Sequence, residues 1–249
     1  MVIKNGLTIG TAKVISNDLL KAGAMIPNAK ITVKYVTAHN TGNWDVPANN
    51  YYRSLKRQNN SKPDSVQASY HFVVDDKEIY QIIDTTNKTW HAGNTTGNNT
   101  SIGVEICMFK DKTRHAKAKK NGQELIAYLL KAHKLGTDKV KAHKDWSGKN
   151  CPQTILAEKN GWANFTKEIK NIYNNGTTST TTSTTKDVNY IVRVTADSLN
   201  VRKGAGTSYD IVTTVKKGDA YTIVKEQNGW GYLKSGAGWI CLSYTEKVK

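Results

Sequence analysis

Residues 176–186 divide this chain, because their sequence, Gly-Thr-Thr-Ser-Thr-Thr-Thr-Ser-Thr-Thr-Lys, contains no apolar side chain. Ordering such a segment would cost conformational entropy without any compensating buried contact. We therefore predict a flexible linker, and a coil of this length has a root-mean-square span on the order of 20 Å. The chain would then consist of a first domain at 1–175 and a second domain at 187–249. Two domains joined in this way can bind separate points on one extended substrate.

The first domain has the sequence pattern of an α/β fold. Runs that are rich in β-branched residues, or that alternate between apolar and polar positions, predict strands, and apolar residues at helical spacing predict helices. We predict strands at 31–38, 70–74, 78–83 and 101–108 and helices at about 48–59, 116–135 and 162–174. Residues 75–77, Asp-Asp-Lys, are typical of a hairpin turn between two of these strands. Strands mixed with helices of this length predict a mixed central sheet flanked by helices.

Short β-like segments dominate the second domain. We predict strands at 190–194, 211–215, 221–225, 230–233 and 238–241. Glycine-containing turn signals such as Asn228-Gly229 and Ser235-Gly236 separate them at about ten-residue spacing, as in small all-β folds. The pattern predicts a small all-β barrel.

The cysteines and the N-terminus bear on where the protein works. Cys107, Cys151 and Cys241 are odd in number and widely spaced, which argues against a disulfide framework. Residues 1–6 lack the apolar core and cleavage site of an export signal, and no stretch reaches the roughly 18 apolar residues that a membrane span requires. We therefore expect a protein made in the host cytoplasm without membrane insertion, which another factor must release if it acts outside the membrane.

A formal net charge of +16 indicates an anionic partner, of which nucleic acid, anionic lipid and acidic cell-wall polymer are the usual candidates. The lysines are spread along the first domain, for example through 110–120 and 131–144, and form no single basic arm. A simpler alternative is that they only keep the protein soluble. Nucleic acid is disfavoured as a partner, because the chain has neither zinc-finger spacing nor an RNP-like aromatic motif.

Two histidines and a cysteine are the residues most suggestive of chemistry. His39 directly follows a β-like run, where a side chain can project from the carboxyl edge of a sheet. His143 and Cys151 share a loop with Gly148 and Pro152 that can fold both side chains toward one point. Each residue alone would more often be an ordinary core or surface residue. Together, two imidazoles, a thiolate and an open fourth position are typical of a catalytic zinc, because structural zinc sites use four protein ligands.

Five segments, in order over about residues 25–172, carry a family resemblance. They are Val36-Thr37-Ala38-His39-Asn40-Thr41, Ser69-Tyr70-His71-Phe72-Val73-Val74, Trp90-His91-Ala92-Gly93, Ser101-Ile102-Gly103-Val104-Glu105-Ile106 and His143 followed after seven residues by Cys151-Pro152. The set resembles the zinc-dependent N-acetylmuramoyl-L-alanine amidases of the amidase-2 type, in the superfamily of phage lysozyme and the peptidoglycan-recognition proteins. That resemblance implies an α/β fold, amide hydrolysis in peptidoglycan and a Zn²⁺ cofactor.

The resemblance implies zinc ligands at His39, His143 and Cys151, a catalytic carboxylate at Glu105 and a lysine at Lys149 that stabilises the transition state. Zinc lowers the pKa of a bound water to about 7. Glu105 could accept the water proton and pass it to the leaving amine, and Lys149 could stabilise the developing oxyanion. Glu105 lies among apolar strand residues, where an idle carboxylate would be costly. The alternatives are a solvated strand residue at Glu105 and an ordinary surface charge at Lys149.

Four further residues are candidates for the same site by resemblance. Tyr70 would assist catalysis, as the equivalent tyrosine does in some family members, or would simply pack. Asn40, Trp90 and His91 are predicted to contact the substrate, and His91 could instead support the residues around the metal.

The second domain resembles a bacterial SH3 domain, the wall-binding module of many endolysins. The resemblance is carried by Leu199-Asn200-Val201-Arg202-Lys203-Gly204, Gly218-Asp219, Asn228-Gly229-Trp230 and Gly238-Trp239-Ile240. Five aromatic residues of this domain could line a ligand groove or fill a small core, namely Trp230, Trp239, Tyr209, Tyr232 and Tyr244. We expect two or three of the five to be exposed.

From these observations we interpret the chain as a monomeric phage or prophage endolysin. Its substrate would be the amide between N-acetylmuramic acid and L-alanine in the peptidoglycan of a Gram-positive wall. A bacterial autolysin of the same chemistry is one alternative, although it should carry an export signal. A non-catalytic peptidoglycan-recognition protein is another, but such proteins commonly lack the cysteine ligand and Cys151 is present.

Overall fold

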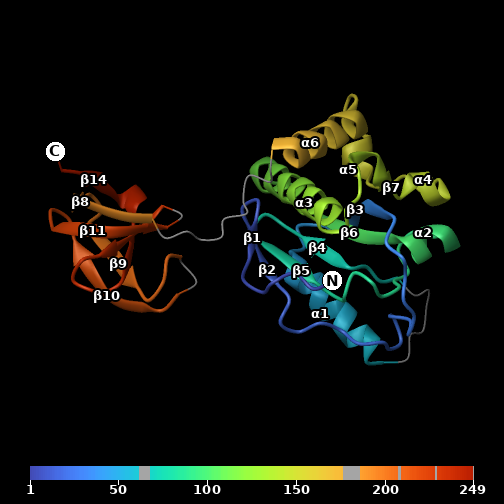
Figure 1. Cartoon of the computed structure of the whole chain (residues 1–249), viewed down its shortest axis with the longest axis horizontal. Helices are drawn as coiled ribbons and strands as arrows, with labels where there is room; N and C mark the ends of the chain where they lie inside the picture. Colours follow the sequence, from blue (N-terminus) through green and yellow to red (C-terminus); the bar gives the residue numbers. More distant parts are fainter. Residues whose placement is uncertain (62–67, 176–185, 207–208, 228, 249) are drawn as a thin grey trace. The chain divides into compact units, whose positions relative to one another are not determined.

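The computed structural model describes residues 1–61, 68–175, 186–206, 209–227 and 229–248. The chain divides into two compact units, Met1–Thr180 and Thr181–Lys249, drawn in Figure 1. The linker predicted at 176–186 lies outside the described residues except for Lys186, which is the first residue of a strand.

The first unit is built on a seven-stranded mixed sheet with the strand order β1-β2-β5-β4-β6-β3-β7. Its strands are β1 (Thr8–Ile9), β2 (Ala12–Ile15), β3 (Tyr35–Trp44), β4 (Phe72–Val74), β5 (Glu78–Gln81), β6 (Ser101–Met108) and β7 (Val140–Ala142). β3 runs parallel to both β6 and β7, and β4 runs parallel to β6, whereas β4 and β5 form an antiparallel hairpin. The predicted mixed sheet is confirmed.

Helices cover both faces of this sheet. They are α1 (Ala48–Asn59), α2 (Thr95–Thr100), α3 (Lys112–Ala132), α4 (Lys144–Ser147), α5 (Gln153–Leu156) and α6 (Gly161–Asn175), with a 3₁₀ turn, η1, at Thr137–Lys139. In Figure 1, α1 lies on one side of the sheet and α3 and α6 on the other. The predicted α/β layering is therefore present.

The long helix α3 shows how local sequence and packing combine. The carboxylate of Asp111 caps its first turn by accepting the backbone N–H of Arg114 at 2.9 Å. Leu125, Leu129 and Leu130 recur at helical spacing and are fully buried. The predicted helix at 116–135 thus begins one turn earlier, because the cap lies at Asp111, and it ends at Ala132.

Strand β3 differs from the prediction at both ends. The expected strand at 31–38 begins only at Tyr35, which lies opposite Ser101, the first residue of β6. In the described part of the chain no strand lies beside residues 31–34, so these residues have no ladder to join. Beyond residue 38 the strand continues to Trp44, because β6 supplies partners as far as Met108.

The hairpin predicted around residues 75–77 is confirmed. The Asp75 carboxylate accepts the backbone N–H groups of Lys77 and Glu78 at 2.7 and 2.8 Å, which holds the turn between β4 and β5. Both strands are shorter than predicted, since the ladder covers only Phe72–Val74 and Glu78–Gln81. The short elements β1, β2, β7, α2, α4 and α5 were not predicted, because pieces of this length carry little periodicity.

The second unit is an antiparallel sheet of seven strands in the order β10-β9-β13-β12-β11-β8-β14. Its elements are β8 (Lys186–Val194), β9 (Ser198–Arg202), β10 (Ile211–Lys216), β11 (Ala220–Gln227), β12 (Trp230–Leu233), β13 (Trp239–Cys241), η2 (Leu242–Tyr244) and β14 (Thr245–Lys247). Its core gathers around Val192, Val201 and Ile223. The predicted all-β architecture is confirmed. No pairing between described residues joins β10 to β14, so the described ladder is open and no closed barrel is seen.

None of the helices in the described ranges combines the length and apolar character needed to cross a membrane.

Candidate metal centre and active site

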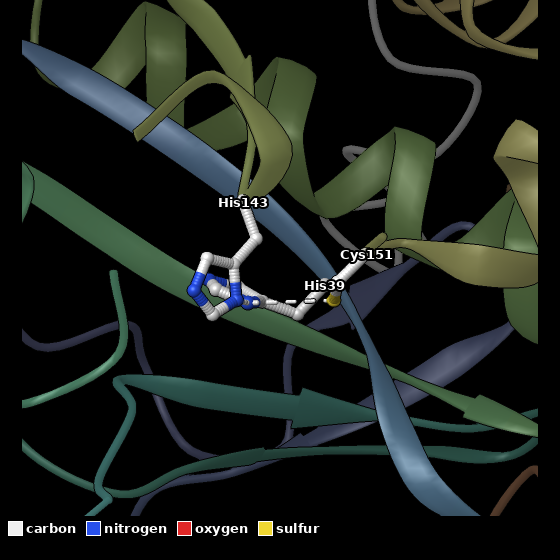
Figure 2. Close-up of side chains that lie close together, drawn as sticks. All are labelled: His39, His143 and Cys151. Carbon is white, nitrogen blue, oxygen red and sulfur yellow. Dashed lines mark hydrogen bonds between the residues drawn. The ribbon is translucent and has the colours of Figure 1, made fainter. Parts of the chain in front are cut away.

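Three side chains from distant parts of the first unit meet at one point. His39 lies on β3, His143 directly follows β7, and Cys151 is separated from α5 by Pro152. The Nδ1 atoms of the two histidines are 3.1 Å apart, and Cys151 Sγ is 3.8 Å from His39 Nδ1. One donor atom from each residue lies within 4.8 Å of the other two. Figure 2 shows the three side chains converging, and the predicted metal ligands are thus brought together.

The parallel register of three strands accounts for this convergence. On β3, Ala38 lies opposite Ala142 of β7, so His39 and His143 follow at the same edge of the sheet. On the other side of β3, His39 itself lies opposite Glu105 of β6. Parallel strands present their carboxyl ends at one edge, which is where sites form in open α/β sheets.

The loop after His143 turns back to deliver the cysteine. Gly148 adopts the left-handed conformation, with φ of 77°, and ends the short helix α4. The backbone N–H of Lys144 then donates to the carbonyl of Cys151 at 3.1 Å, which closes the loop. The side chain of Asn40 fastens the next residues, since its Oδ1 accepts the backbone N–H and the hydroxyl of Thr154 at 3.0 and 2.8 Å.

Burial sets the protonation of the three donors. It lowers the pKa of His39 well below its usual value, and the neighbouring His91 and His143 act in the same direction. The pKa of His143 is also lowered, mainly by burial. Burial raises the pKa of the Cys151 thiol to about 11. Neutral imidazoles are the form that binds metal, and a thiol in this environment needs a cation to become a thiolate.

Glu105 lies beside this cluster with an unusual environment for a carboxylate. Its Oε1 is 3.9 Å from His39 Nδ1, and its Oε2 is buried with no hydrogen-bond partner among the described residues. Burial raises the pKa of Glu105 to about 8, while the positive charge of Lys149 acts in the opposite direction. A carboxyl group with a pKa near neutrality can both accept and return a proton at physiological pH.

A cavity of about 550 Å³ opens onto the cluster. Every site residue predicted from the sequence lines it, namely His39, Asn40, Tyr70, Trp90, His91, Glu105, His143, Lys149 and Cys151. Lys149 is exposed. The phenol of Tyr70 is half-buried, and burial together with the charge of Glu105 raises its pKa well above the usual value, so it stays protonated.

Two of the predicted substrate contacts make well-defined bonds within the protein. Besides accepting from Thr154, Asn40 donates from Nδ2 to the carbonyl of Ile106 at 3.2 Å. His91 bonds His39 through Nδ1 and the carbonyl of Ser101 through Nε2, each at 3.1 Å. The third, Trp90, carries the ammonium of Lys88 4.2 Å from its ring centroid. Contact of these residues with substrate stays a prediction.

Other cavity-lining residues were missed by sequence reasoning. They include Thr41, Gly42, Tyr51, Ser69, Gly93, Ser147, Asn150 and Gln153. Ser147 and Asn150 could have been found, because they lie in the loop between two predicted ligands. No such signal marked Tyr51, because its helical spacing is explained equally well by packing in the core as by a place in the cavity.

The second unit has a smaller cavity of about 390 Å³. It is lined by Ala196, Ser198, Leu199, Asn200, Arg202, Trp230, Cys241 and Tyr244. Of the aromatic residues named for this unit, Tyr209 and Tyr244 are 48% and 53% exposed, and Trp230, Tyr232 and Trp239 are half-buried. Two exposed aromatics agree with the expectation of two or three.

Comparison with known proteins agrees with this arrangement. A family model described as N-acetylmuramoyl-L-alanine amidase matches residues 29–154, and one described as bacterial SH3 domain matches residues 197–245. N-acetylmuramoyl-L-alanine amidase CwlA of Bacillus subtilis (strain 168) is 41% identical over 152 residues, which cover 59% of this chain and 53% of CwlA. The chain spans about half the length of the curated relatives it matches.

Solved structures extend the similarity to the fold of the first unit. The catalytic domain of XlyA has a TM-score of 0.55 at 38% identity, covering 64% of this chain and 99% of that domain. A mutant endolysin from Bacillus subtilis has a TM-score of 0.56 at 38% identity, with the same coverage of 64% and 99%. With half of its length matched by the family model and nearly all of a solved catalytic domain covered, the chain belongs to the N-acetylmuramoyl-L-alanine amidase family.

Proposed function

We propose that this chain is a zinc-dependent N-acetylmuramoyl-L-alanine amidase that degrades the wall of a Gram-positive host cell. The bond cleaved is the amide between the lactyl group of N-acetylmuramic acid and the L-alanine of the stem peptide. The observation that carries the proposal is the convergence of His39, His143 and Cys151 beside the buried carboxyl of Glu105, in a cavity open to substrate. The relatives CwlA and XlyA are named for the same activity.

The donor set fits zinc as the metal. Two imidazoles and one thiolate suit a borderline cation, and three protein ligands leave the fourth position that a catalytic site requires. Zinc held by these ligands would supply a hydroxide at neutral pH and polarise the amide carbonyl.

Glu105 moves the protons in this proposal. Its carboxylate takes the proton of the attacking water and returns it to the amine nitrogen that leaves with L-alanine. A pKa of about 8 favours both steps, because the group is then neither too weak a base nor too weak an acid.

Lys149 and Tyr70 stabilise the oxygen that becomes negative as the amide is attacked. Both line the cavity, and the charge of Lys149 acts on the pKa of Glu105, which supports a role for its ammonium near the reacting groups. A fixed cation or phenol donor acts more strongly on the developing oxyanion than on the neutral amide, and therefore lowers the barrier. Trp90 and Asn40, which line the same cavity, contact the bound muropeptide.

The second unit anchors the enzyme to the wall in this proposal. Support comes from the bacterial SH3 match over residues 197–245 and from the cavity that Trp230 and Tyr244 line. Aromatic faces beside polar groups suit sugars and peptides. The likeness to a solved endolysin supports a phage or prophage origin. The enzyme of this proposal is a monomer that is made in the host cytoplasm and acts on the wall after release.

The products of wall digestion test the reaction. Purified Gram-positive walls treated with the zinc-loaded protein should gain free N-terminal alanine and no new reducing sugar. Boiled protein gives the background. Release of reducing ends without N-terminal alanine would identify a glycosidase and overturn the proposal.

Removing the second unit tests the division of labour. We expect residues 1–175 to cleave soluble muropeptide at nearly the full-chain rate but to lose roughly tenfold or more in lysis of whole walls, because tethering raises the local enzyme concentration. The loss should grow with salt, which screens the attraction of a basic catalytic unit to anionic wall polymer. Wall turbidity at low and high salt measures this.

The full chain carrying Trp230→Ala and Tyr244→Ala is the matched control for that experiment. It keeps both units and the linker, and should behave like the truncated enzyme if the 390 Å³ cavity holds the wall ligand. Equal lysis by the truncated and full-length proteins at every salt concentration would show that the second unit does not target the wall.

A further inference from the structure

His91 links a candidate metal ligand to the backbone of the sheet. On one side, its Nδ1 lies 3.1 Å from Nε2 of His39. On the other, its Nε2 lies 3.1 Å from the carbonyl oxygen of Ser101. The remaining nitrogen of His39, Nδ1, faces His143 Nδ1 and Cys151 Sγ. An unbroken chain of hydrogen bonds therefore runs from the carbonyl of Ser101 through His91 to His39, the candidate metal ligand.

The direction of each bond in this chain follows from its fixed end. A carbonyl oxygen can only accept, so the proton of a neutral His91 lies on Nε2. Its Nδ1 then has a free lone pair and accepts a proton from Nε2 of His39. With its proton on Nε2, His39 has an unprotonated Nδ1, which is the atom that faces the other two donors.

We propose that His91 is a positioning residue that fixes the tautomer and the ring orientation of His39, so that His39 Nδ1 is the metal-binding atom. Hydrogen bonds to the second nitrogen of a metal-bound histidine hold the ring and increase its basicity, and their loss typically weakens metal binding by about 10- to 100-fold. This inference rests on the metal centre of the proposed function. It assigns to His91 a role other than contact with substrate.

The surroundings of His91 hold it in one orientation. The Asn98 side-chain oxygen accepts the backbone N–H groups of His91 and Ala92 at 2.9 and 2.8 Å, which fastens the loop. A Cβ atom at Gly103 would lie 2.7 Å from Cγ of His91, so only glycine leaves room for the ring. The ring of His91 also meets that of His39 edge to face, with centroids 5.2 Å apart. A side chain this confined, with both nitrogens bonded, is suited to orienting a neighbour.

Asparagine and leucine at position 91 make a matched pair for the test. The two side chains have the same branching and similar size, but only asparagine offers an oxygen near the place of the Nδ1 lone pair. We expect His91→Leu to weaken zinc binding by about 10- to 100-fold in competition with a chelator, and His91→Asn to stay within about threefold of the wild type. Trp90→Leu is the control, because it alters the same cavity without touching His39, and its zinc affinity should be unchanged.

A second measurement begins with the metal-free wild type, so its first result does not depend on the folding of any variant. Proton–nitrogen correlation spectra of the imidazoles should show the His39 proton on Nε2. In His91→Leu the same spectra should show a mixture of tautomers. Rescue of a single tautomer by His91→Asn would separate a hydrogen-bonding role from simple packing.

Two results would overturn the inference. One is a His39 proton on Nδ1 in the metal-free wild type, and the other is wild-type zinc affinity in a folded His91→Leu protein. Failure of the proposed function would look different, because the wild type itself would then bind no zinc or release no N-terminal alanine.

Discussion

Replacing Glu105 with glutamine will leave zinc bound and the fold intact while turnover falls by about 10² to 10⁴, the usual contribution of a general acid or base. Glutamine has nearly the shape of glutamate but cannot carry a proton between water and the leaving amine. Hydrolysis of soluble muropeptide, measured with metal content and melting temperature on the same sample, checks this. Metal content and melting temperature should both match those of the wild type.

Tyr70→Phe is the comparison that locates the proton transfer. It removes the phenol from the same cavity and leaves the carboxyl of Glu105 unchanged. We expect a smaller loss than for Glu105→Gln, since a phenol held in its protonated form can donate to the oxyanion but cannot act as the base. If Glu105→Gln instead lost less than about threefold with zinc retained, a loss well below that expected for general acid–base catalysis, Glu105 would not be the residue that transfers the proton.

Replacing any one of His39, His143 and Cys151 with alanine will remove both stoichiometric zinc and hydrolysis. With only three protein donors available, the loss of one leaves too few to hold the ion in its geometry. Metal analysis after dialysis and a muropeptide assay give the two readouts. Because the protein binds the metal before any substrate reacts, the zinc content of these variants should fall even in the absence of substrate.

Matched substitutions elsewhere in the chain show whether such losses are specific. His133 lies at the C-terminal end of α3, where its ring bonds the hydroxyl of Thr85, and Cys241 lies in the second unit. His133→Ala and Cys241→Ala should therefore keep one zinc per chain and wild-type turnover. Full zinc occupancy together with normal turnover in a ligand variant would show that the metal is held by other residues.

Neighbouring residues along the chain were enough to determine several features from the sequence alone. The helix at 48–59 and the strand at 101–108 have the predicted bounds, because each carries a full period of its pattern over several turns or pairs. The turn at 75–77 follows from the short carboxylate of Asp75, which bonds the backbone two and three residues later. The types of donor, two imidazoles and a thiolate, were likewise evident from composition and order.

Only the tertiary structure determined the burial, the pKa and the hydrogen bonding of the side chains in the candidate site. Along β6, Gly103, Glu105 and Cys107 alternate in sequence with apolar residues, yet helices cover the sheet on both sides and Cys107 is as buried as its apolar neighbours. Glu105 is thereby desolvated, and its pKa rises to about 8. Similarly, the hydrogen bond between Nε2 of His39 and Nδ1 of His91 joins residues that are 52 positions apart in the chain. Secondary structure depends on near neighbours in the chain, whereas desolvation and hydrogen-bond direction depend on residues that folding brings together from dozens of positions away.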